Sequence, residues 1–204
     1  MKLIFATHNA NKTIEIQQLL GDDFELLSLE DLSYHQDIPE TAITLEGNSK
    51  IKANVVYDYF NLPCFADDTG LEVEVLGGEP GVYSARYAGE EKNAQKNMDL
   101  LLNKLEGINN RRARFRTVIT YKTKGGIHQF EGIVEGEIID RKIGDYGFGY
   151  DPIFKPKGLD ITFAQMSTEQ KNQYSHRARA FEKLKAFLKK TEIFKSTFFT
   201  LNLT

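Results

Sequence analysis

The stretch KLIFATHNANKTIEIQQLLGDDFELLSL, residues 2–29, decides the fold. Its apolar start, residues 2–7, predicts a short strand, and residues 24–29 predict a second one. Between them, residues 11–20 place apolar side chains at helical spacing and end before a glycine. A strand, a helix and a strand in this order favour a right-handed crossover, so we expect at least part of the sheet to be parallel.

Later segments add antiparallel strands and further helices. Residues 44–60 predict a second helix, and residues 90–107 predict the clearest helix of the chain. Two alternating runs around a Gly-Gly turn at 125–126 predict an antiparallel hairpin. A capping box at 167–170 opens a short helix, and a last helix follows it. We therefore expect an α/β fold, a mixed β-sheet flanked by helices, formed by one domain over residues 1–190.

Composition narrows the class of protein. The 204 residues carry a formal net charge of -3, and 41% of them are hydrophobic. These values are typical of a globular protein and exclude a general attraction to nucleic acid or to anionic membranes. Cys64 is the only cysteine, which excludes an internal disulfide and a cysteine-rich metal site. The first apolar run is too short for a signal peptide or a membrane span, so we expect a cytoplasmic protein.

The turn THNANK, residues 7–12, is a candidate phosphate site. It joins the first strand to the first helix, so the free amides at the helix start face the loop beside Lys12. The spacing is not that of a P-loop, which needs more glycine and a Gly-Lys-Ser/Thr ending. The alternative interpretation of these residues is a helix capped by an asparagine, with a solvated lysine.

The run FADDTG, residues 65–70, is a candidate metal site. We interpret it as the end of a buried strand, with Asp67 and Asp68 at the tip and a reversal at Gly70. Mg²⁺ usually takes one or two carboxylates and completes its shell with water and phosphate oxygens. Glu40, in the preceding loop, could join that shell. A polar turn in which the two aspartates cap their own backbone is the alternative.

Three further stretches carry candidate ligand-binding residues. Lys52 lies four residues after an asparagine on the second helix, on a face that could reach the acidic pair. Phe148 and Tyr150 stand between glycines, an arrangement that can offer a ring to a planar base. His176 and Arg177 begin the last helix, at an end that favours anions. For Lys52, the alternative is a solvated helix face. For Phe148 and Tyr150, it is a loop held by buried rings. For His176 and Arg177, it is a capped helix.

The densest basic run, RRARFR at residues 111–116, could form a nucleic-acid surface. Alternation puts Arg112, Arg114 and Arg116 on one face of the strand, which also describes a half-buried strand with one solvated face. Because the chain is acidic overall, we favour the second interpretation and expect no nucleic-acid partner.

In order and spacing, THNANK, IPET, FADDTGLEVEVLGGEPGVYSARYAG, GFGYDPIF and STEQKNQYSHRARAF closely resemble the inosine/xanthosine triphosphate pyrophosphatase family. The resemblance extends from residue 3 to about residue 188 and implies two lobes with a central nucleotide-binding cleft, in a homodimer. It also implies Mg²⁺-dependent hydrolysis of ITP, dITP or XTP to a nucleoside monophosphate and pyrophosphate, which would clean the nucleotide pool.

The resemblance further implies roles for individual residues. Asp68 would be the catalytic base and a metal ligand, Glu40 a second ligand, and Asp67 a further candidate ligand. His176 and Arg177 would read the 6-oxo edge of the base. The substrate-binding set that it implies is Thr7, His8, Asn9, Ala10, Asn11, Lys12, Lys52, Thr69, Phe148, Gly149, Tyr150, Asp151, Lys171, His176 and Arg177.

Two residues depart from the family pattern, the tail is not covered by it, and three other functions are compatible with the sequence. His8 and Thr69 stand where relatives more often have a small residue and a serine, so His8 could narrow the phosphate loop. The tail, residues 191–204, lies beyond the resemblance, and its alternation fits an edge strand or a dimer contact. There are three competing functions. They are a pyrophosphatase for modified pyrimidine or methylated nucleotides, a nucleotide sensor without turnover, and an RNA-binding module that uses residues 111–116.

Overall fold

The computed structural model describes residues 2–20 and 24–201, and its side chains are described as far as residue 191. The strands are β1 (Lys2–Phe5), β2 (Glu25–Ser28), β3 (Cys64–Val73), β4 (Pro80–Gly81), β5 (Arg112–Thr123), β6 (Gly126–Ile138) and β7 (Phe154–Pro156). The α-helices are α1 (Ala10–Leu20), α2 (Leu45–Phe60), α3 (Ala94–Lys104), α4 (Thr168–Asn172) and α5 (His176–Leu201). Short 3-10 turns are η1 (Glu74–Leu76), η2 (Ser84–Arg86), η3 (Asp151–Ile153) and η4 (Phe163–Gln165).

The predicted crossover is confirmed. Strand β1 pairs in parallel with β2, with Leu3 opposite Leu26, and also pairs in parallel with β3. The sheet runs in the order β2-β1-β3-β5-β6-β7, with β4 attached to β3. The predicted hairpin is confirmed as well, because β5 and β6 are antiparallel and join at the glycine turn. The sheet is therefore mixed, as expected.

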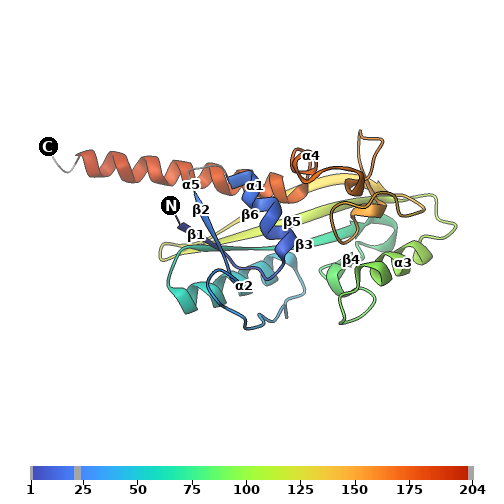
Figure 1. The fold of residues 1–204 in the computed structure, drawn as a ribbon, viewed down its shortest axis with the longest axis horizontal. Coiled ribbons are helices and arrows are strands. Elements are labelled where there is room, and N and C mark those ends of the chain that lie inside the picture. The colour runs from blue at the N-terminus through green and yellow to red at the C-terminus, as the bar shows by residue number, and fades with distance from the viewer. Residues whose placement is uncertain (1, 21–23, 202–204) are drawn as a thin grey trace.

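Helices cover both faces of this sheet (Figure 1). Helices α1 and α5 pack on one face around Phe5, Phe65 and Phe181, whereas α2 packs on the other face against Ala66. A third core, at the far end of the long strands, joins α3 to the segments around η3 and η4. The predicted capping box, Ser167–Gln170, opens α4, and Thr44 caps α2.

Strand β3 corrects the expectation for the acidic pair. The strand does not end at the aspartates but continues to Val73, with Asp67 opposite Ile119 and Asp68 opposite Val118 on β5. Both the predicted strand tip and the reversal at the glycine are therefore wrong. A Cβ added at Gly70 would lie 2.6 Å from the carbonyl oxygen of Gly81, so this glycine permits the close approach of β4.

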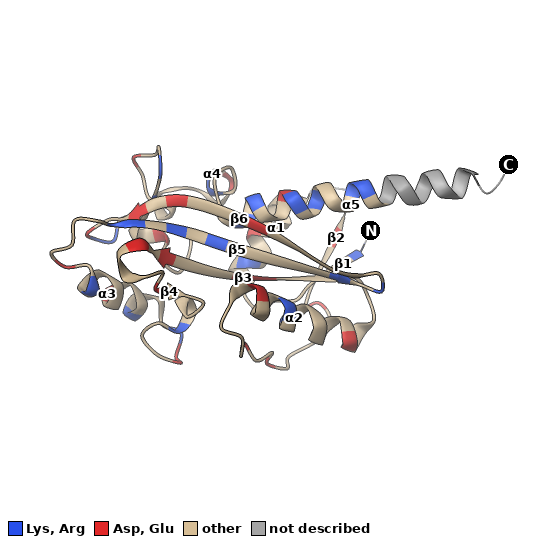
Figure 2. Ribbon diagram, turned by 180° about the vertical axis from the view of Figure 1, so that it is seen from behind, with Lys and Arg blue, Asp and Glu red and all other residues tan. Residues whose placement is uncertain are grey.

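Arginines of the basic run 111–116 pair with acidic residues on neighbouring strands and on α2. Figure 2 shows basic residues along β5 between acidic residues of β3 and β6. Arg114 Nε lies 2.7 Å from Glu72 Oε2, and Arg116 contacts Glu46 and Glu131. The charges of Arg114 and Arg116 are compensated by the sheet and by α2, which agrees with the interpretation as a strand with one solvated face.

Helix α5 includes residues 191–201, so the edge strand that the alternation suggested is wrong for this part of the tail. Residues 202–204 lie outside the described residues. Within the described part of the chain, no helix combines the length and the apolar character needed to cross a bilayer.

We predict that Gly132→Ala destabilises the fold, because β6 and α5 touch there. An added Cβ would lie 2.0 Å from the carbonyl oxygen of His176 and 2.4 Å from the amide nitrogen of Ala180. The free energy of unfolding, measured with urea, should fall by about 3 kcal/mol. Gly125→Ala is the matched control, since its nearest neighbour would be 3.5 Å away. Equal stability of the two variants would contradict this packing.

Candidate active site

A cleft of about 520 Å³ lies between the part of the sheet covered by α2 and the part covered by α3. It receives side chains from the β1–α1 turn, the loop before α2, the middle of β3, and the starts of α3 and α5. From the predicted set, the cleft is lined by Thr7, His8, Asn9, Lys12, Glu40, Lys52, Asp68, Thr69, Phe148, Gly149, Tyr150, Asp151, Lys171, His176 and Arg177. Ala10, Asn11 and Asp67 do not line it.

A larger hollow, of about 1080 Å³, lies over the far end of the sheet. Its charged side chains stand on neighbouring strands and pair with one another, as Lys155 does with Glu137 at 2.7 Å. Exposed ion pairs of this kind are common on sheet surfaces and do not converge on a reacting atom. The smaller cleft is therefore the better candidate.

The β1–α1 turn combines an asparagine cap with a half-buried lysine. Asn9 Oδ1 accepts hydrogen bonds from the amides of Asn11 at 3.0 Å and Lys12 at 3.3 Å. Lys12 is not solvated, because its Nζ lies 2.8 Å from Asp67 Oδ1 and its side chain is 13% exposed. The ring of His8 bonds through Nε2 to the carbonyl oxygen of Gln36 at 3.0 Å, which ties the turn to the loop before α2.

The two aspartates point to opposite faces of β3, as neighbours in a strand do. Asp67 reaches the α1 and α5 side, where Lys12 and Arg177 Nε (3.0 Å) contact its two oxygens. Asp68 reaches the α2 side, where Asn48 Nδ2 donates to it at 3.3 Å and Lys52 Nζ lies 3.5 Å away. The carboxylates therefore do not share one site, and each has its own cationic partners.

The surroundings move the pKa values of the two aspartates in opposite directions. Burial alone would raise the pKa of Asp67, but Lys12 and Arg177 hold it well below the usual range. Burial raises the pKa of Asp68, and the nearby Glu40 and Asp67 add to this rise, against the lowering effect of Lys52 and Lys12. Paired carboxylates whose pKa values are pushed apart are typical of a division between structural and acid–base roles.

Glu40 and Asp68 could hold a divalent cation. Lys52 Nζ lies between them, 2.5 Å from Glu40 Oε1 and 3.5 Å from Asp68 Oδ1, and both carboxylates face the cleft. Two carboxylates suit Mg²⁺, which fills its remaining positions with water and phosphate oxygens. Asp67 does not fit, because its side chain does not line the cleft and pairs with Lys12 and Arg177 on the other side of the strand. No three His, Cys, Asp or Glu side chains of the described residues come together as a complete protein-only site.

The loop at 148–151 holds an aromatic ring beside two cations. Asp151 Oδ2 accepts from the amide of Phe148 at 2.8 Å and from Lys171 Nζ at 2.6 Å. The Phe148 ring centroid lies 4.7 Å from Lys171 Nζ and 5.5 Å from Arg177 Cζ. Tyr150 is buried and donates its hydroxyl to the carbonyl oxygen of Ser84 at 2.9 Å. The loop is therefore fixed on both sides, with its half-buried phenylalanine at the cleft.

His176 and Arg177 enter the cleft from the first turn of α5. The His176 ring stacks on Phe115, with centroids 4.5 Å apart, and its Nδ1 has no hydrogen-bond partner among the described residues. Burial, with Arg177 and Lys171 nearby, lowers the pKa of His176 well below its usual value, so the ring is neutral at pH 7. Arg177 is buried and also donates to Thr69 Oγ1 at 3.2 Å.

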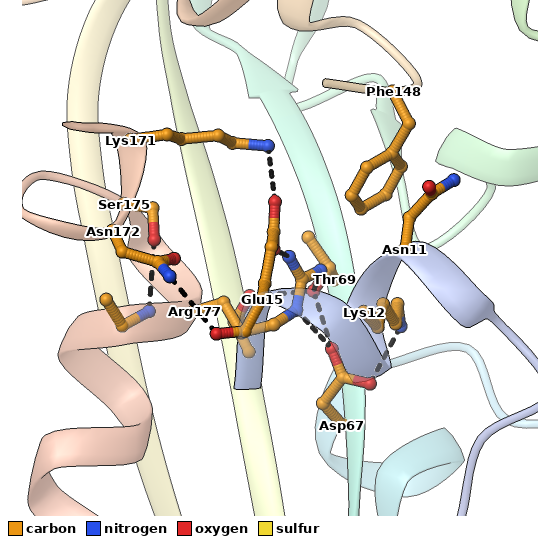
Figure 3. Close-up of polar contacts among 12 residues, drawn as sticks. Asn11, Lys12, Glu15, Asp67, Thr69, Phe148, Lys171, Asn172, Ser175 and Arg177 are labelled. Carbon is orange, nitrogen blue, oxygen red and sulfur yellow. Dashed lines mark hydrogen bonds and ion pairs between the residues drawn. The ribbon is translucent and has the colours of Figure 1, made fainter. Parts of the chain in front are cut away.

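Glu15 is a residue of this site that sequence reasoning missed. Figure 3 shows its carboxylate between Lys171 and Arg177. Lys171 Nζ lies 2.7 Å from Glu15 Oε1, and Arg177 contacts Glu15 Oε2. The two cations keep the pKa of the buried Glu15 low, although burial by itself would raise it. The available signal was its place on the inner face of the helix, next to Ile16, where a carboxylate needs a buried partner.

Comparisons with known proteins agree on one family. The model of the Ham1 family matches residues 3–187. The dITP/XTP pyrophosphatase of Flavobacterium psychrophilum is 53% identical over 189 residues, which cover 93% of this chain and 100% of the relative. The corresponding protein of Bacillus subtilis is 43% identical, covering 91% and 96%. The structure of the Staphylococcus aureus Ham1 protein matches with a TM-score of 0.85 and 42% identity, covering 94% and 100%.

We predict that Glu15→Gln destabilises the protein, because it leaves Lys171 and Arg177 short of one buried negative charge. Breaking a buried ion pair in this way costs about 3–5 kcal/mol, measured as the free energy of unfolding in urea. Glu46→Gln is the matched control. It removes the same charge from a 40% exposed partner of Arg116 and should cost about 1 kcal/mol or less. A loss at Glu15 no larger than that at Glu46 would contradict the role of the buried pair.

Proposed function

Because the chain belongs to the Ham1 family, we propose that it hydrolyses the deaminated purine nucleotides ITP, dITP and XTP to a nucleoside monophosphate and pyrophosphate. The observation that carries the proposal is the asymmetry of the acidic pair. Asp67 is neutralised by two cations, whereas Asp68 faces the cleft with a raised pKa beside Lys52 and Glu40. A carboxylate with a raised pKa is a stronger base than an ordinary one, which suits it to accept a proton from water.

The proposed reaction is an in-line displacement at the α phosphorus. Asp68 accepts a proton from the attacking water, whose oxygen forms a bond to the α phosphorus. The bond from this phosphorus to the bridging oxygen breaks, and pyrophosphate leaves with the electron pair. Mg²⁺, which Glu40 and Asp68 would hold, supplies positive charge to the phosphate oxygens when bound. Lys52 keeps these two carboxylates in place through its contacts with both.

Base recognition is assigned to the residues that line the cleft from the 148–151 loop and from the start of α5. The Phe148 ring offers a face for stacking, and the neutral His176 and the guanidinium of Arg177 can present N–H donors. A 6-oxo purine accepts a hydrogen bond where adenine donates one, so ATP would leave donors facing donors. Such unpaired polar groups give strong discrimination.

Two further features are proposed from the family alone. We infer that the protein acts as a homodimer and in the cytoplasm. Light scattering coupled to size exclusion measures the mass in solution, and a mass near that of one chain would contradict the dimer.

We predict metal-dependent release of pyrophosphate from ITP and XTP, with little from ATP. The assay compares ITP, XTP, GTP and ATP, each with Mg²⁺ and with a chelator, and identifies the products by chromatography. IMP and pyrophosphate from ITP are the expected products. Turnover confined to modified pyrimidine nucleotides, or no turnover by folded protein, would contradict the proposed function.

We predict opposite effects for asparagine at the two aspartates. Asp68→Asn should lower kcat by about 10²- to 10⁴-fold, the usual contribution of a general base. It should leave stability nearly unchanged, because the fold already disfavours the charged form of this carboxyl. Asp67→Asn should instead lower the free energy of unfolding by about 3 kcal/mol or more, since Lys12 and Arg177 lose their buried partner. Full activity of Asp68→Asn would refute the proposed base.

A further inference from the structure

Most cations of the cleft are already neutralised by the protein. Five lysine and arginine side chains line it: Lys12, Lys52, Lys92, Lys171 and Arg177. Lys12 is paired with Asp67, and Lys52 lies between Glu40 and Asp68. Lys171 and Arg177 share Glu15 and have Asp151 and Asp67 as second partners. Arg86, which does not line the cleft, also contacts Glu40 at 3.6 Å, so five carboxylates face these four cations and Arg86. None of these cations is left without a carboxylate partner.

This balance matters for a triphosphate, which brings several negative charges into the cleft. Lys12, Lys52, Lys171 and Arg177 belong to the predicted substrate-binding set, but each of them is already paired with a carboxylate of the protein. A bound divalent cation offsets part of the remaining charge. A further cation with no carboxylate partner would be the natural ligand for the phosphates that carry most of the charge.

Lys92 meets this description. It lines the cleft, its side chain is exposed, and no hydrogen bond or ion pair joins it to another described side chain. It is also close enough to act on Glu40. Burial raises the pKa of Glu40, but Lys52, with Lys12 and Lys92, keeps it below its ordinary value. Its neighbours are engaged elsewhere: Lys96 pairs with Glu91 at 2.8 Å.

The backbone at Lys92 is unusual for a lysine. Its φ of 51° lies in the left-handed region, directly before Asn93, the N-cap of α3. Arg86, another cation near Glu40, packs over the ring of Tyr83. Its guanidinium donates to the carbonyl oxygen of Glu40 at 3.4 Å and lies 3.6 Å from the Glu40 carboxylate. The charge of Arg86 is therefore directed at the protein, whereas that of Lys92 is left to the solvent at the mouth of the cleft.

We propose that Lys92 binds the β and γ phosphates of the substrate and stays with them in the pyrophosphate product. This inference rests on the proposed function. With the base at Phe148 and the α phosphorus at Asp68, the remaining phosphates extend along Lys52 and Glu40 toward Lys92. Lys92 thus stabilises the leaving group and contributes to substrate affinity. Other side chains bind the base and activate the attacking water.

The test compares Lys92→Met, which keeps length and removes charge, with Lys92→Arg, which keeps charge. The dissociation constants of pyrophosphate and of IMP are measured by calorimetry in Mg²⁺ buffer, and KM and kcat are measured with ITP. Lys92→Met should weaken pyrophosphate binding and raise KM by about tenfold, the loss of one charge-assisted hydrogen bond. IMP affinity should stay within about twofold, and Lys92→Arg should restore pyrophosphate affinity.

Lys96→Met is the matched control, since it removes a neighbouring lysine that is paired with Glu91 outside the cleft. Pyrophosphate affinity and KM unchanged in Lys92→Met, or equally changed in Lys96→Met, would overturn the inference. The two proposals fail separately. Wild-type protein that binds pyrophosphate through Lys92 but does not hydrolyse ITP would refute the function and keep the phosphate contact. Turnover of ITP with wild-type KM in Lys92→Met would refute the contact alone.

Discussion

The contact on which the structure of the cleft depends is the buried pairing of Arg177 with Glu15 and Asp67. It joins the start of α5, the middle of α1 and the centre of β3, three segments that are far apart in the sequence. A buried guanidinium is tolerated only when its donors and its charge are matched, so each of these segments has to be in place before the others are satisfied. The same contact presents His176 and Phe148 to the cleft, because both stand next to members of the network. The stability of the fold and the geometry of the site are therefore set by one group of charges.

Local patterns predicted the parts of the fold that local physics determines. The crossover at residues 2–29, the hairpin around Gly125 and the capping box at Ser167 follow from apolar periodicity, turn residues and capping, and the structure has all of them. The family resemblance then brought together the residues that line the cleft, which spacing by itself did not do. Long-range contacts explain the errors. Asp-Asp-Thr-Gly has the local chemistry of a turn, and only partners on α1, α2 and α5 allow it to continue as a central strand.

Glu15 illustrates the same limit from the other side. Its partners Lys171 and Arg177 lie 156 and 162 positions away in the sequence, so no window along the chain could reveal that this carboxylate is compensated. Lys12 in the candidate phosphate turn likewise looks available in the sequence, yet it is paired with Asp67. Counting cations near a motif therefore overestimates the charge available to a ligand. The structure corrects that estimate, and the correction identifies Lys92 at the mouth of the cleft as the cation without a partner among the described side chains.

The alternation of β3 has a consequence for how sequence changes can alter this protein. Asp67, which pairs with Lys12 and Arg177, and Asp68, which lines the cleft, are consecutive residues. Only the pleat of the strand directs them to opposite faces. An insertion or deletion of a single residue in the preceding half of β3 would exchange their faces, because a slip of one position turns every side chain over. Lys12 and Arg177 would then face the carboxylate of Asp68. The cleft would receive the carboxylate of Asp67 instead. The length of this strand is therefore fixed as strictly as the identity of its two aspartates.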